Sequence, residues 1–343
     1  MKASVPDRIC SRCILSSSFP GVQIGDDGLC NVCRSAPSID EMAAIRDSLR
    51  DAMRAVIEAN RGTSRYDCVV AYSGGKDSTF TLQLLVREYG ARCLALTVDN
   101  GFLSDQALQN GHRVTSALEV DFLLFKPSPS FMNRMYRTSA TTPGIHARSA
   151  ITRGSAICNS CINLINNIAV LTALEKSIPT IAGGYLGGQV PKDAAVIRID
   201  LASQLAARKS TLDKYESHFG AEARRYFDID PELLRRSTLT HLNVINPMLT
   251  LSVSESQIID TIHPLGWDRP ADTGAQSSNC RLNDVGIVMH HRQHGFNPYT
   301  TEIAEQVRYG LMSRDEGLRR ASEIPDPADV TQQAMQVGID LNA

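Results

Sequence analysis

The stretch from Val69 to Ser78, with the sequence VVAYSGGKDS, constrains the fold of this chain more than any other segment. It starts in a short apolar run, 67–72, that predicts a buried strand, and it leads into a helical pattern over 78–89. Gly74 and Gly75 lie between the two and let the backbone turn tightly and approach an anion closely. Backbone N–H groups and the helix dipole favour phosphate at such a turn. The stretch therefore predicts an α/β domain that binds phosphate where a helix begins.

Strand and helix patterns alternate along the chain after this point. The alternation predicts a parallel sheet covered by helices on both faces. The segment 138–153 has neither pattern and is long for a connection, so we expect a mobile flap over the active site. The predicted strands are 67–72, 92–98, 122–125 and 180–182, and the predicted helices are 78–89, 104–118, 130–137 and 159–176.

Side chains of three kinds in the glycine turn suit a nucleotide with a magnesium ion. Lys76 supplies a positive charge, and Ser73 and Ser78 supply hydroxyl donors. Asp77 would repel a bare phosphate, so a place beside Mg²⁺ explains it better. The spacing does not match GxxxxGK[ST], so the turn is not a Walker A loop. A surface glycine turn without a ligand is the alternative.

The turn resembles the SGGxDS signature of the PP-loop family of ATP pyrophosphatases at every defined position. The resemblance implies that the loop holds the pyrophosphate of ATP while a substrate oxygen attacks the α-phosphorus, giving an adenylated intermediate and pyrophosphate. It also implies ATP and Mg²⁺ as cofactors, with Lys76 and Asp77 as catalytic residues that stabilise charge on the leaving pyrophosphate. The loop residues expected to bind the nucleotide are Ser73, Gly74, Gly75, Lys76, Asp77 and Ser78.

Two more segments are expected at the same edge of the sheet. Asp99 ends the second predicted strand, where ligands bind in parallel sheets, and it either reaches the nucleotide or caps a turn. The cluster 182–189, AGGYLGGQ, follows the last predicted strand. PP-loop proteins commonly complete their nucleotide or substrate site there, so Gly183 and Gly184 are expected site residues. A loop hinge is the alternative.

Four cysteines near the N-terminus have the spacing of a structural zinc site. Residues 14–29 separate a first Cys-x-x-Cys pair from a second, and each pair points two thiolates at one ion. A segment this short buries too little surface to fold without a metal. The total of nine cysteines is odd, which argues against a disulfide framework. Four incidental cysteines are the alternative to the predicted Zn²⁺ ligands, which are Cys10, Cys13, Cys30 and Cys33.

Three further cysteines form a second candidate metal site. Cys158 and Cys161 make a third Cys-x-x-Cys pair, and Cys280 lies far along the chain. This arrangement resembles the tRNA-thiolation branch of the PP-loop family, the 2-thiocytidine and 2-thiouridine synthetases. The resemblance implies a [4Fe-4S] cluster bound by the three cysteines, with its fourth iron open to carry sulfide. The alternatives are a persulfide-carrying pair, or a zinc site completed by His290, His291 or His294.

The C-terminal half carries a second resemblance. The segments DTG, 272–274, and SNCRLN, 278–283, together with the N-terminal cysteines and the SGGKDS loop, resemble the N-acetyl sugar amidotransferase group of PP-loop proteins. In that group ammonia attacks the adenylated carbon. The Cys158/Cys161 pair is not a regular feature of that group, so the sequence favours sulfur.

We therefore expect an enzyme that adenylates a carbonyl or carboxylate oxygen with ATP and then inserts sulfur from the cluster. The first alternative is an amidotransferase that uses ammonia on a nucleotide-linked N-acetyl sugar. The second is a non-catalytic nucleotide-binding adaptor with a zinc knuckle. The sulfur route also needs a sulfur donor, either sulfide or a persulfide carrier.

Charge favours a small-molecule substrate over tRNA. Lys plus Arg is 35 and Asp plus Glu is 37, so the net charge is −2, whereas dedicated nucleic-acid binders usually have a basic excess. A tRNA held by a local basic surface stays open. We find no targeting sequence and no apolar run that approaches a membrane span, so we expect a cytoplasmic protein without a membrane partner. The resembling enzymes are often dimers, which keeps a homodimer in view.

The patterns divide the chain into four parts. Residues 1–36 are the predicted zinc knuckle, and 37–62 are a linker around an amphipathic helix, 39–60, with a capping box at Ser38 and Glu41. Residues 63–200 are the predicted ATP-binding α/β domain of PP-loop or HUP-like type. Beyond 200 the strand signal fades, so 201–343 is predicted to be a mostly helical region that contributes Cys280.

Overall fold

The computed structural model describes residues 7–191 and 193–341. At its centre lies a six-stranded sheet with the order β3-β2-β1-β4-β6-β5. Neighbouring strands are parallel except β5 and β6, which are antiparallel, so the predicted α/β fold is confirmed. The strands are β1 Cys68–Ala71, β2 Cys93–Val98, β3 Asp121–Phe125, β4 Thr180–Ala182, β5 Val196–Asp200 and β6 His241–Ile245.

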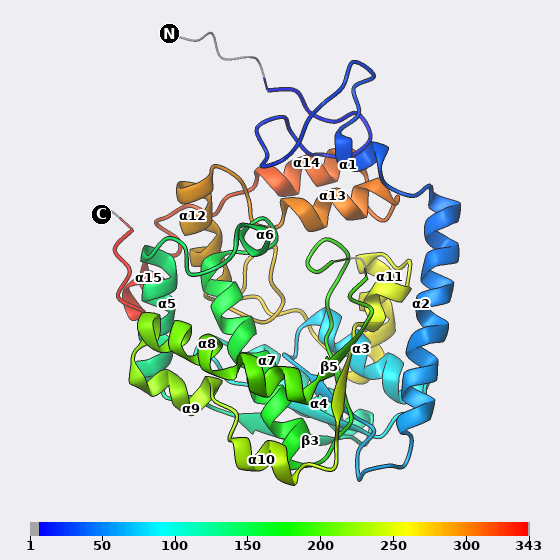
Figure 1. Ribbon diagram of the computed structural model, residues 1–343. Helices are drawn as coiled ribbons and strands as arrows, with labels where there is room; N and C mark the ends of the chain where they lie inside the picture. Colours follow the sequence, from blue (N-terminus) through cyan, green and yellow to red (C-terminus); the bar gives the residue numbers. More distant parts are fainter. Residues whose placement is uncertain (1–6, 192, 342–343) are drawn as a thin grey trace.

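Helices cover both faces of this sheet (Figure 1). Successive side chains of a strand point to opposite faces, so Val69 packs into one apolar cluster while Cys68 packs into the other. The cluster around Val69 includes α5 Pro129–Thr141, α7 Ala156–Glu175, α8 Leu201–Phe219, α9 Arg224–Phe227, α12 Asn283–His294 and α15 Thr331–Gln336. The cluster around Cys68 includes α2 Ile39–Asn60, α3 Lys76–Arg87, α4 Asp105–Ala117 and α11 Glu255–Ile262.

The N-terminal knuckle packs on helices from the other end of the chain. In Figure 1 it lies at the top, directly above α13 Thr300–Arg308 and α14 Arg314–Ser322. Ile14, Leu15 and Phe19 share an apolar cluster with Ile303 and Val307 of α13. The remaining helical segments are short: α1 Asn31–Arg34, α6 Arg148–Ile151, α10 Pro231–Arg236, and the 3₁₀ turns Ala221–Ala223, Pro247–Thr250 and His263–Leu265.

The strand order places two glycine-rich turns side by side. From β1 the chain moves outward to β2 and β3, whereas β4 pairs with the opposite side of β1, through Val70 and Ala182. The point where the order reverses leaves a crevice beyond the carboxyl ends of the strands, which is where open α/β sheets bind ligands. The SGGKDS loop follows β1, and the 182–189 cluster follows β4, so both reach this crevice.

The sheet continues past residue 200, where the sequence predicted its end. β6 lies between β4 and β5, so the helical region 201–343 contributes a strand to the interior of the sheet. β6 has the sequence HLNVI, which is too short and too polar to stand out as a buried strand. The predicted boundary at 200 is therefore not a boundary of the sheet.

The prediction of a long loop over 138–153 is wrong for half of its length. α5 extends to Thr141, and α6 occupies Arg148–Ile151. Between them, Ile145 is buried, and the ring of His146 hydrogen-bonds to Ser160 of α7 at 2.8 Å. These contacts attach the segment to the core.

α7 is the one helix in the described residues that is long and apolar enough to cross a membrane by length and composition. The sequence predicted no such segment, because three asparagines interrupt the apolar pattern. Half of the apolar window is buried inside the protein, where α7 contacts β1 and β4. This burial explains its composition as that of a core helix.

We predict that Asp67 stabilises the start of β1 and that its contribution to the free energy of unfolding is lost in acid. Asp67 is 3% exposed and accepts hydrogen bonds from the guanidinium and N–H of Arg92 and from the N–H of Gly62. Burial opposes its ionisation, but these donors together lower its pKa. Asp67→Asn should cost about 1–2 kcal/mol of unfolding free energy at pH 7 in urea titrations.

This contribution to the free energy of unfolding is complete above the ordinary carboxyl pKa and is lost as the pH falls through the lower pKa of Asp67 in the folded state. Wild type and Asp67→Asn should therefore become equally stable in acid. Glu58→Gln is the matched control, because its partner Arg61 lies on an exposed turn and such pairs contribute well under about 1 kcal/mol. Equal losses for the two variants would contradict the prediction.

Candidate active site

The turn between β1 and α3 is held by contacts to its backbone. Gly74 has a φ of +73°, a region that side chains rarely adopt, and a Cβ there would lie 2.1 Å from the carbonyl oxygen of Ala107. The carbonyl of Gly74 accepts hydrogen bonds from Trp267 Nε1 at 2.9 Å and Asn110 Nδ2 at 3.5 Å. Gly74 is therefore required both by conformation and by space.

Serine hydroxyls gather around the N–H groups of the loop. The N–H of Ser73 donates to Ser78 Oγ at 3.2 Å, that of Gly75 to Ser73 Oγ at 3.3 Å, and that of Lys76 to Ser278 Oγ at 3.0 Å. Because these donors converge at the N-terminus of the twelve-residue helix α3, the same N–H groups suit phosphate oxygens. Ser278 belongs to the SNCRLN segment, so that segment touches the loop directly.

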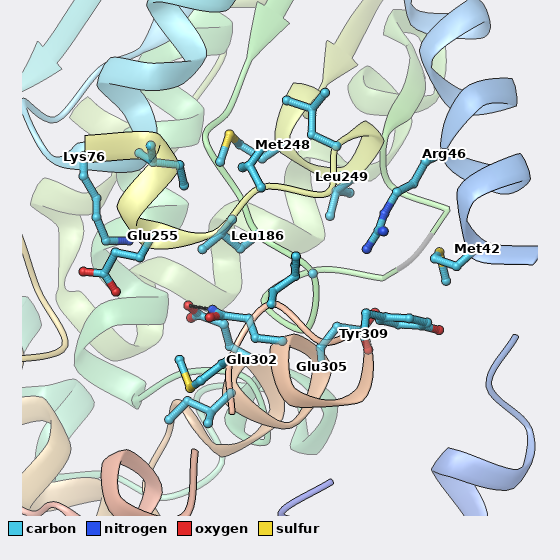
Figure 2. A pocket seen from close by; sticks show the side chains of 18 of the residues that line it. Met42, Arg46, Lys76, Leu186, Met248, Leu249, Glu255, Glu302, Glu305 and Tyr309 are labelled. Atoms are coloured by element: carbon cyan, nitrogen blue, oxygen red, sulfur yellow. Dashed lines mark hydrogen bonds between the residues drawn. The ribbon is translucent and has the colours of Figure 1, made fainter. Parts of the chain in front are cut away.

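Lys76 sits among carboxylates at the start of α3. Its Nζ lies 2.9 Å from both carboxylate oxygens of Asp77. Burial disfavours the ammonium form, yet Asp77, Glu255 and Glu302 together raise the pKa of Lys76. Figure 2 shows the side chain of Lys76 extending toward Glu255. The lysine is therefore a positive charge within the loop, paired with the carboxylate of the next residue, and its role with phosphate stays a prediction.

Glu302 is a site residue that sequence reasoning missed. Its carboxylate accepts hydrogen bonds from Gln189 Nε2 at 2.8 Å and Gln306 Nε2 at 3.1 Å. Burial raises the pKa of Glu302 to about 7, and the negative charge of Asp77 adds to the effect while Lys76 acts against it. The sequence around Glu302 gives no sign that this residue is buried near the loop, because α13 reaches the loop only through tertiary packing.

The second glycine cluster lies against the loop, and its role in binding stays a prediction. A Cβ on Gly184 would lie 3.0 Å from the backbone of Ser78, so glycine allows the two turns to approach. Both turns line a cavity of about 510 Å³, which we call the nucleotide cavity. The loop and cluster residues on its wall are Ser73, Gly75, Asp77, Ser78, Gly183, Gly184, Tyr185 and Gln189, whereas the predicted binding residues Gly74 and Lys76 do not line it.

Asp99 lies apart from this cavity. Its Oδ1 accepts the N–H of Gly101 at 2.9 Å, and its Oδ2 pairs with Lys126 at 2.7 Å. These contacts match the turn-capping alternative, whereas the neighbouring Asn100 lines the nucleotide cavity. A role for Asp99 with the nucleotide stays a prediction.

The three distant cysteines come together beside the nucleotide cavity. Asn100 Nδ2 lies 3.6 Å from Cys161 Sγ and 3.5 Å from Cys280 Sγ. With Cys158, they line a space of about 230 Å³ that we call the cysteine chamber. Its wall shares Asp77, Asn100, Cys158, Ser278, Asn279 and Tyr299 with the nucleotide cavity, so the two spaces are contiguous.

Burial controls the ionisation of these thiols. It raises the pKa of Cys158 to about 12 and that of Cys161 to about 11, and it also raises the pKa of Cys280. A metal ion ionises a thiol that coordinates it. Three thiols on one wall would leave one iron of a [4Fe-4S] cluster without a protein ligand. In the described part of the chain, no group of three ligand atoms within 4.8 Å includes these cysteines or His290, His291 and His294.

The four N-terminal cysteines form a compact ligand set, in agreement with their spacing. All four are buried, and their sulfur atoms lie within 4.8 Å of one another. Backbone N–H groups of Leu15, Cys30 and Cys33 donate to cysteine sulfurs at 3.3–3.5 Å. Such a set suits a tetrahedral metal ion.

Two arginines of the C-terminal region hold the knuckle. Arg308 Nε donates to Cys33 Sγ at 3.3 Å, and Arg314 donates to the carbonyls of Cys10 and Cys13. A hydrogen bond from Cys13, with the charge of Arg308, lowers the pKa of Cys33 to about 4. The knuckle is therefore tied to α13, the helix that carries Glu302.

Comparison with known proteins gives distant relatives. No family model matches the chain. A curated relative, uncharacterized protein MJ1599 of Methanocaldococcus jannaschii, is 22% identical over 277 residues, which cover 81% of this chain and 80% of the relative.

Similar solved structures include three enzymes. The U34-tRNA thiolase NcsA of Methanococcus maripaludis with its [4Fe-4S] cluster is 12% identical, covers 82% of this chain and 81% of its own, and has a TM-score of 0.35. An NH3-dependent NAD synthetase of Campylobacter jejuni is 14% identical; the match covers 88% of this chain and 94% of the synthetase, with a TM-score of 0.37. The NMN synthetase of Francisella tularensis is 13% identical; the match covers 85% of this chain and 100% of the synthetase, with a TM-score of 0.38. At these values the likeness carries no argument about the reaction.

The chain resembles the PP-loop ATP pyrophosphatases in its own residues and fold. The SGGKDS loop joins the first strand of a mostly parallel sheet to the helix that follows it. The loop lies at the switch point, beside a second glycine turn and a cavity.

We predict that Gly74→Ala destabilises the protein by about 2 kcal/mol or more, because the alanine would combine a strained φ with a clash against Ala107. Gly310→Ala is the matched control: its φ is +72°, but nothing lies within 4 Å of the added Cβ. The control should cost only about 1 kcal/mol. Urea midpoints at pH 7 measure both, and equal losses would show that the close approach at Gly74 has no energetic weight.

Proposed function

We propose that this protein is an enzyme that activates a small acceptor molecule by adenylation with ATP and then transfers sulfur to the activated carbon. One observation carries the proposal: the cavity lined by the SGGKDS loop is contiguous with a chamber lined by three cysteines. A site for a leaving pyrophosphate and a site for a sulfur nucleophile therefore adjoin.

In the first step the loop binds the triphosphate. Negative charge develops on the pyrophosphate as it leaves. It would be stabilised by hydrogen bonds from the N–H groups of Ser73, Gly75 and Lys76 and by the Lys76 ammonium. Asp77 is the proposed Mg²⁺ ligand. An acceptor oxygen attacks the α-phosphorus, the bond between the α-phosphorus and the bridging oxygen breaks, and the acceptor becomes an adenylate.

In the second step sulfide attacks the adenylated carbon, and AMP departs with the former acceptor oxygen. Cys158, Cys161 and Cys280 would hold a [4Fe-4S] cluster, which supplies an open iron for the incoming sulfide when it is bound. Asn100 holds two of the three sulfurs toward each other. Sulfide is the proposed donor. A persulfide carrier is the alternative, and it would also need a thiol that releases the outer sulfur as sulfide by forming a disulfide with the carrier.

An amidotransferase is the second candidate, and one contact favours it. Ser278 and Asn279, from the segment that resembles the N-acetyl sugar amidotransferases, line both the nucleotide cavity and the cysteine chamber. Ammonia would then attack the same adenylate in place of sulfide. The activation step is common to both candidates.

The N-terminal knuckle is proposed to bind Zn²⁺ and to act structurally. Its four buried thiols leave no open position for chemistry. The proposed acceptor is a small molecule, with tRNA as the alternative, in a cytoplasmic setting.

We predict that the protein converts ATP to AMP and pyrophosphate when it is screened against nucleosides, sugars, carboxylates and bulk tRNA. Lys76→Ala should lower the rate of pyrophosphate release about a hundredfold or more, because it removes the charge beside the leaving group. Lys176→Ala, at the exposed end of α7, is the matched control and should leave the rate unchanged. Formation of ADP in place of AMP would refute the proposed activation.

Metal analysis of anaerobically prepared protein tests the second step. We expect about one zinc and about four iron atoms per chain, with acid-labile sulfide. Cys158→Ser should lose iron and keep zinc, and Cys33→Ser should lose zinc, because the two sets lie in separate parts of the fold. A colourless protein without iron that is active with ammonia would favour the amidotransferase.

A further inference from the structure

A third space adjoins Lys76, which lines this space and the cysteine chamber but not the nucleotide cavity. It has a volume of about 160 Å³ and is bounded by α2, α11, α13 and the 3₁₀ turn Pro247–Thr250. We call it the apolar chamber, because Leu186, Met248, Leu249 and Ile303 form its middle. Figure 2 shows Lys76 and Glu255 at one end and Arg46 and Tyr309 at the other.

The inner end of this chamber belongs to the candidate active site. Lys76 and Glu302 line both the apolar chamber and the cysteine chamber, as do Ala275 and Gln276. A molecule in the apolar chamber would therefore present one end to the loop and the cysteines while its body stays out of the nucleotide cavity.

The charged groups of the chamber differ in whether they are paired. Lys76 pairs with Asp77, Glu255 with Arg269 and Arg320, and Glu305 with Arg308. Arg46 has no ion pair and no hydrogen bond with any of the described residues. Its guanidinium lies over the ring of Tyr309, at 5.4 Å from the centroid, and Glu305, which is itself paired with Arg308, attracts it only at longer range. In Figure 2 that guanidinium points into the chamber.

Size and charge together define the occupant. A cavity of roughly 150 Å³ with apolar walls holds a benzene-sized body. A guanidinium that forms no ion pair within the protein favours a carboxylate, which it binds through two N–H groups. Met42, Ile45 and Leu49 of α2 extend the apolar wall to Arg46.

We propose that the apolar chamber holds the acceptor substrate, a small amphipathic molecule whose carboxylate binds Arg46 and whose ring or branched aliphatic body lies along Leu186, Met248 and Ile303. Its reacting carbonyl or carboxyl group lies at the other end, between Lys76 and Glu302. This inference rests on the proposed adenylation for its role, but the binding site itself does not.

Binding of benzoate and of benzyl alcohol to the full-length protein tests the site, measured by calorimetry or saturation-transfer NMR. The two probes share an apolar ring and differ in charge. Benzoate should bind more tightly than benzyl alcohol, and Arg46→Gln should weaken benzoate about tenfold while leaving benzyl alcohol within about twofold. Arg46→Lys should retain part of the preference, because it keeps the charge without the planar fork.

Leu249→Trp fills the chamber and should abolish binding of both probes while ATP affinity stays unchanged. Failure of benzoate to bind wild type at millimolar concentration would overturn the inference, and so would equal binding of both probes that is insensitive to Arg46. Loss of acceptor-dependent pyrophosphate release in Leu249→Trp would support the substrate role, and retained release would overturn it. If wild type releases no pyrophosphate at all, the proposed function fails, and the probe results still decide whether the chamber binds small carboxylates.

Discussion

The close approach of two glycine turns is the contact on which the site depends. β1 and β4 are neighbours at the switch point of the sheet, so the turns that follow them must pass within van der Waals distance. Gly184 fits against the backbone of Ser78, and Gly74 against the carbonyl of Ala107. A side chain at Gly184 would push the two turns apart, and a side chain at Gly74 would push the loop away from α4. The phosphate-binding geometry of the loop is therefore a consequence of sheet topology as much as of local sequence.

The knuckle extends this constraint to the other end of the chain. Arg308 and Val307 of α13 contact the knuckle, and Glu302 on the same helix faces Lys76. A change in the four-cysteine set would therefore shift the helix that completes the loop's surroundings. The four-cysteine set lies apart from the nucleotide cavity, yet α13 connects the two. A metal bound by the four thiols would therefore stabilise a helix that carries a residue of the candidate site.

The features that the sequence predicted correctly depend on residues that lie close together in the chain. The capping box of Ser38 and Glu41 and the bounds of α2 are found as predicted, because a cap and an apolar stripe lie within one helix. The glycine loop and the N-terminal cysteine spacing were readable for the same reason. β6, Asn100 and Glu302 were not, because each acquires its place only when segments distant in sequence pack together. Glu302 in particular becomes a buried acid through contacts with Gln189, which lies 113 positions earlier in the chain.

The two cysteine sites differ in a way that bears on their chemistry. The N-terminal set has four sulfurs within 4.8 Å of one another, all buried, which is the closed arrangement of a structural metal. The second set has three cysteines on the wall of an open chamber, and Asn100 and Ser278 connect that chamber to the loop. A metal held only for stability needs neither a missing ligand nor a passage to a nucleotide. In the proposed function, a group held by Cys158, Cys161 and Cys280 alone would keep a free position beside the activated carbon, which is what delivery of a nucleophile requires.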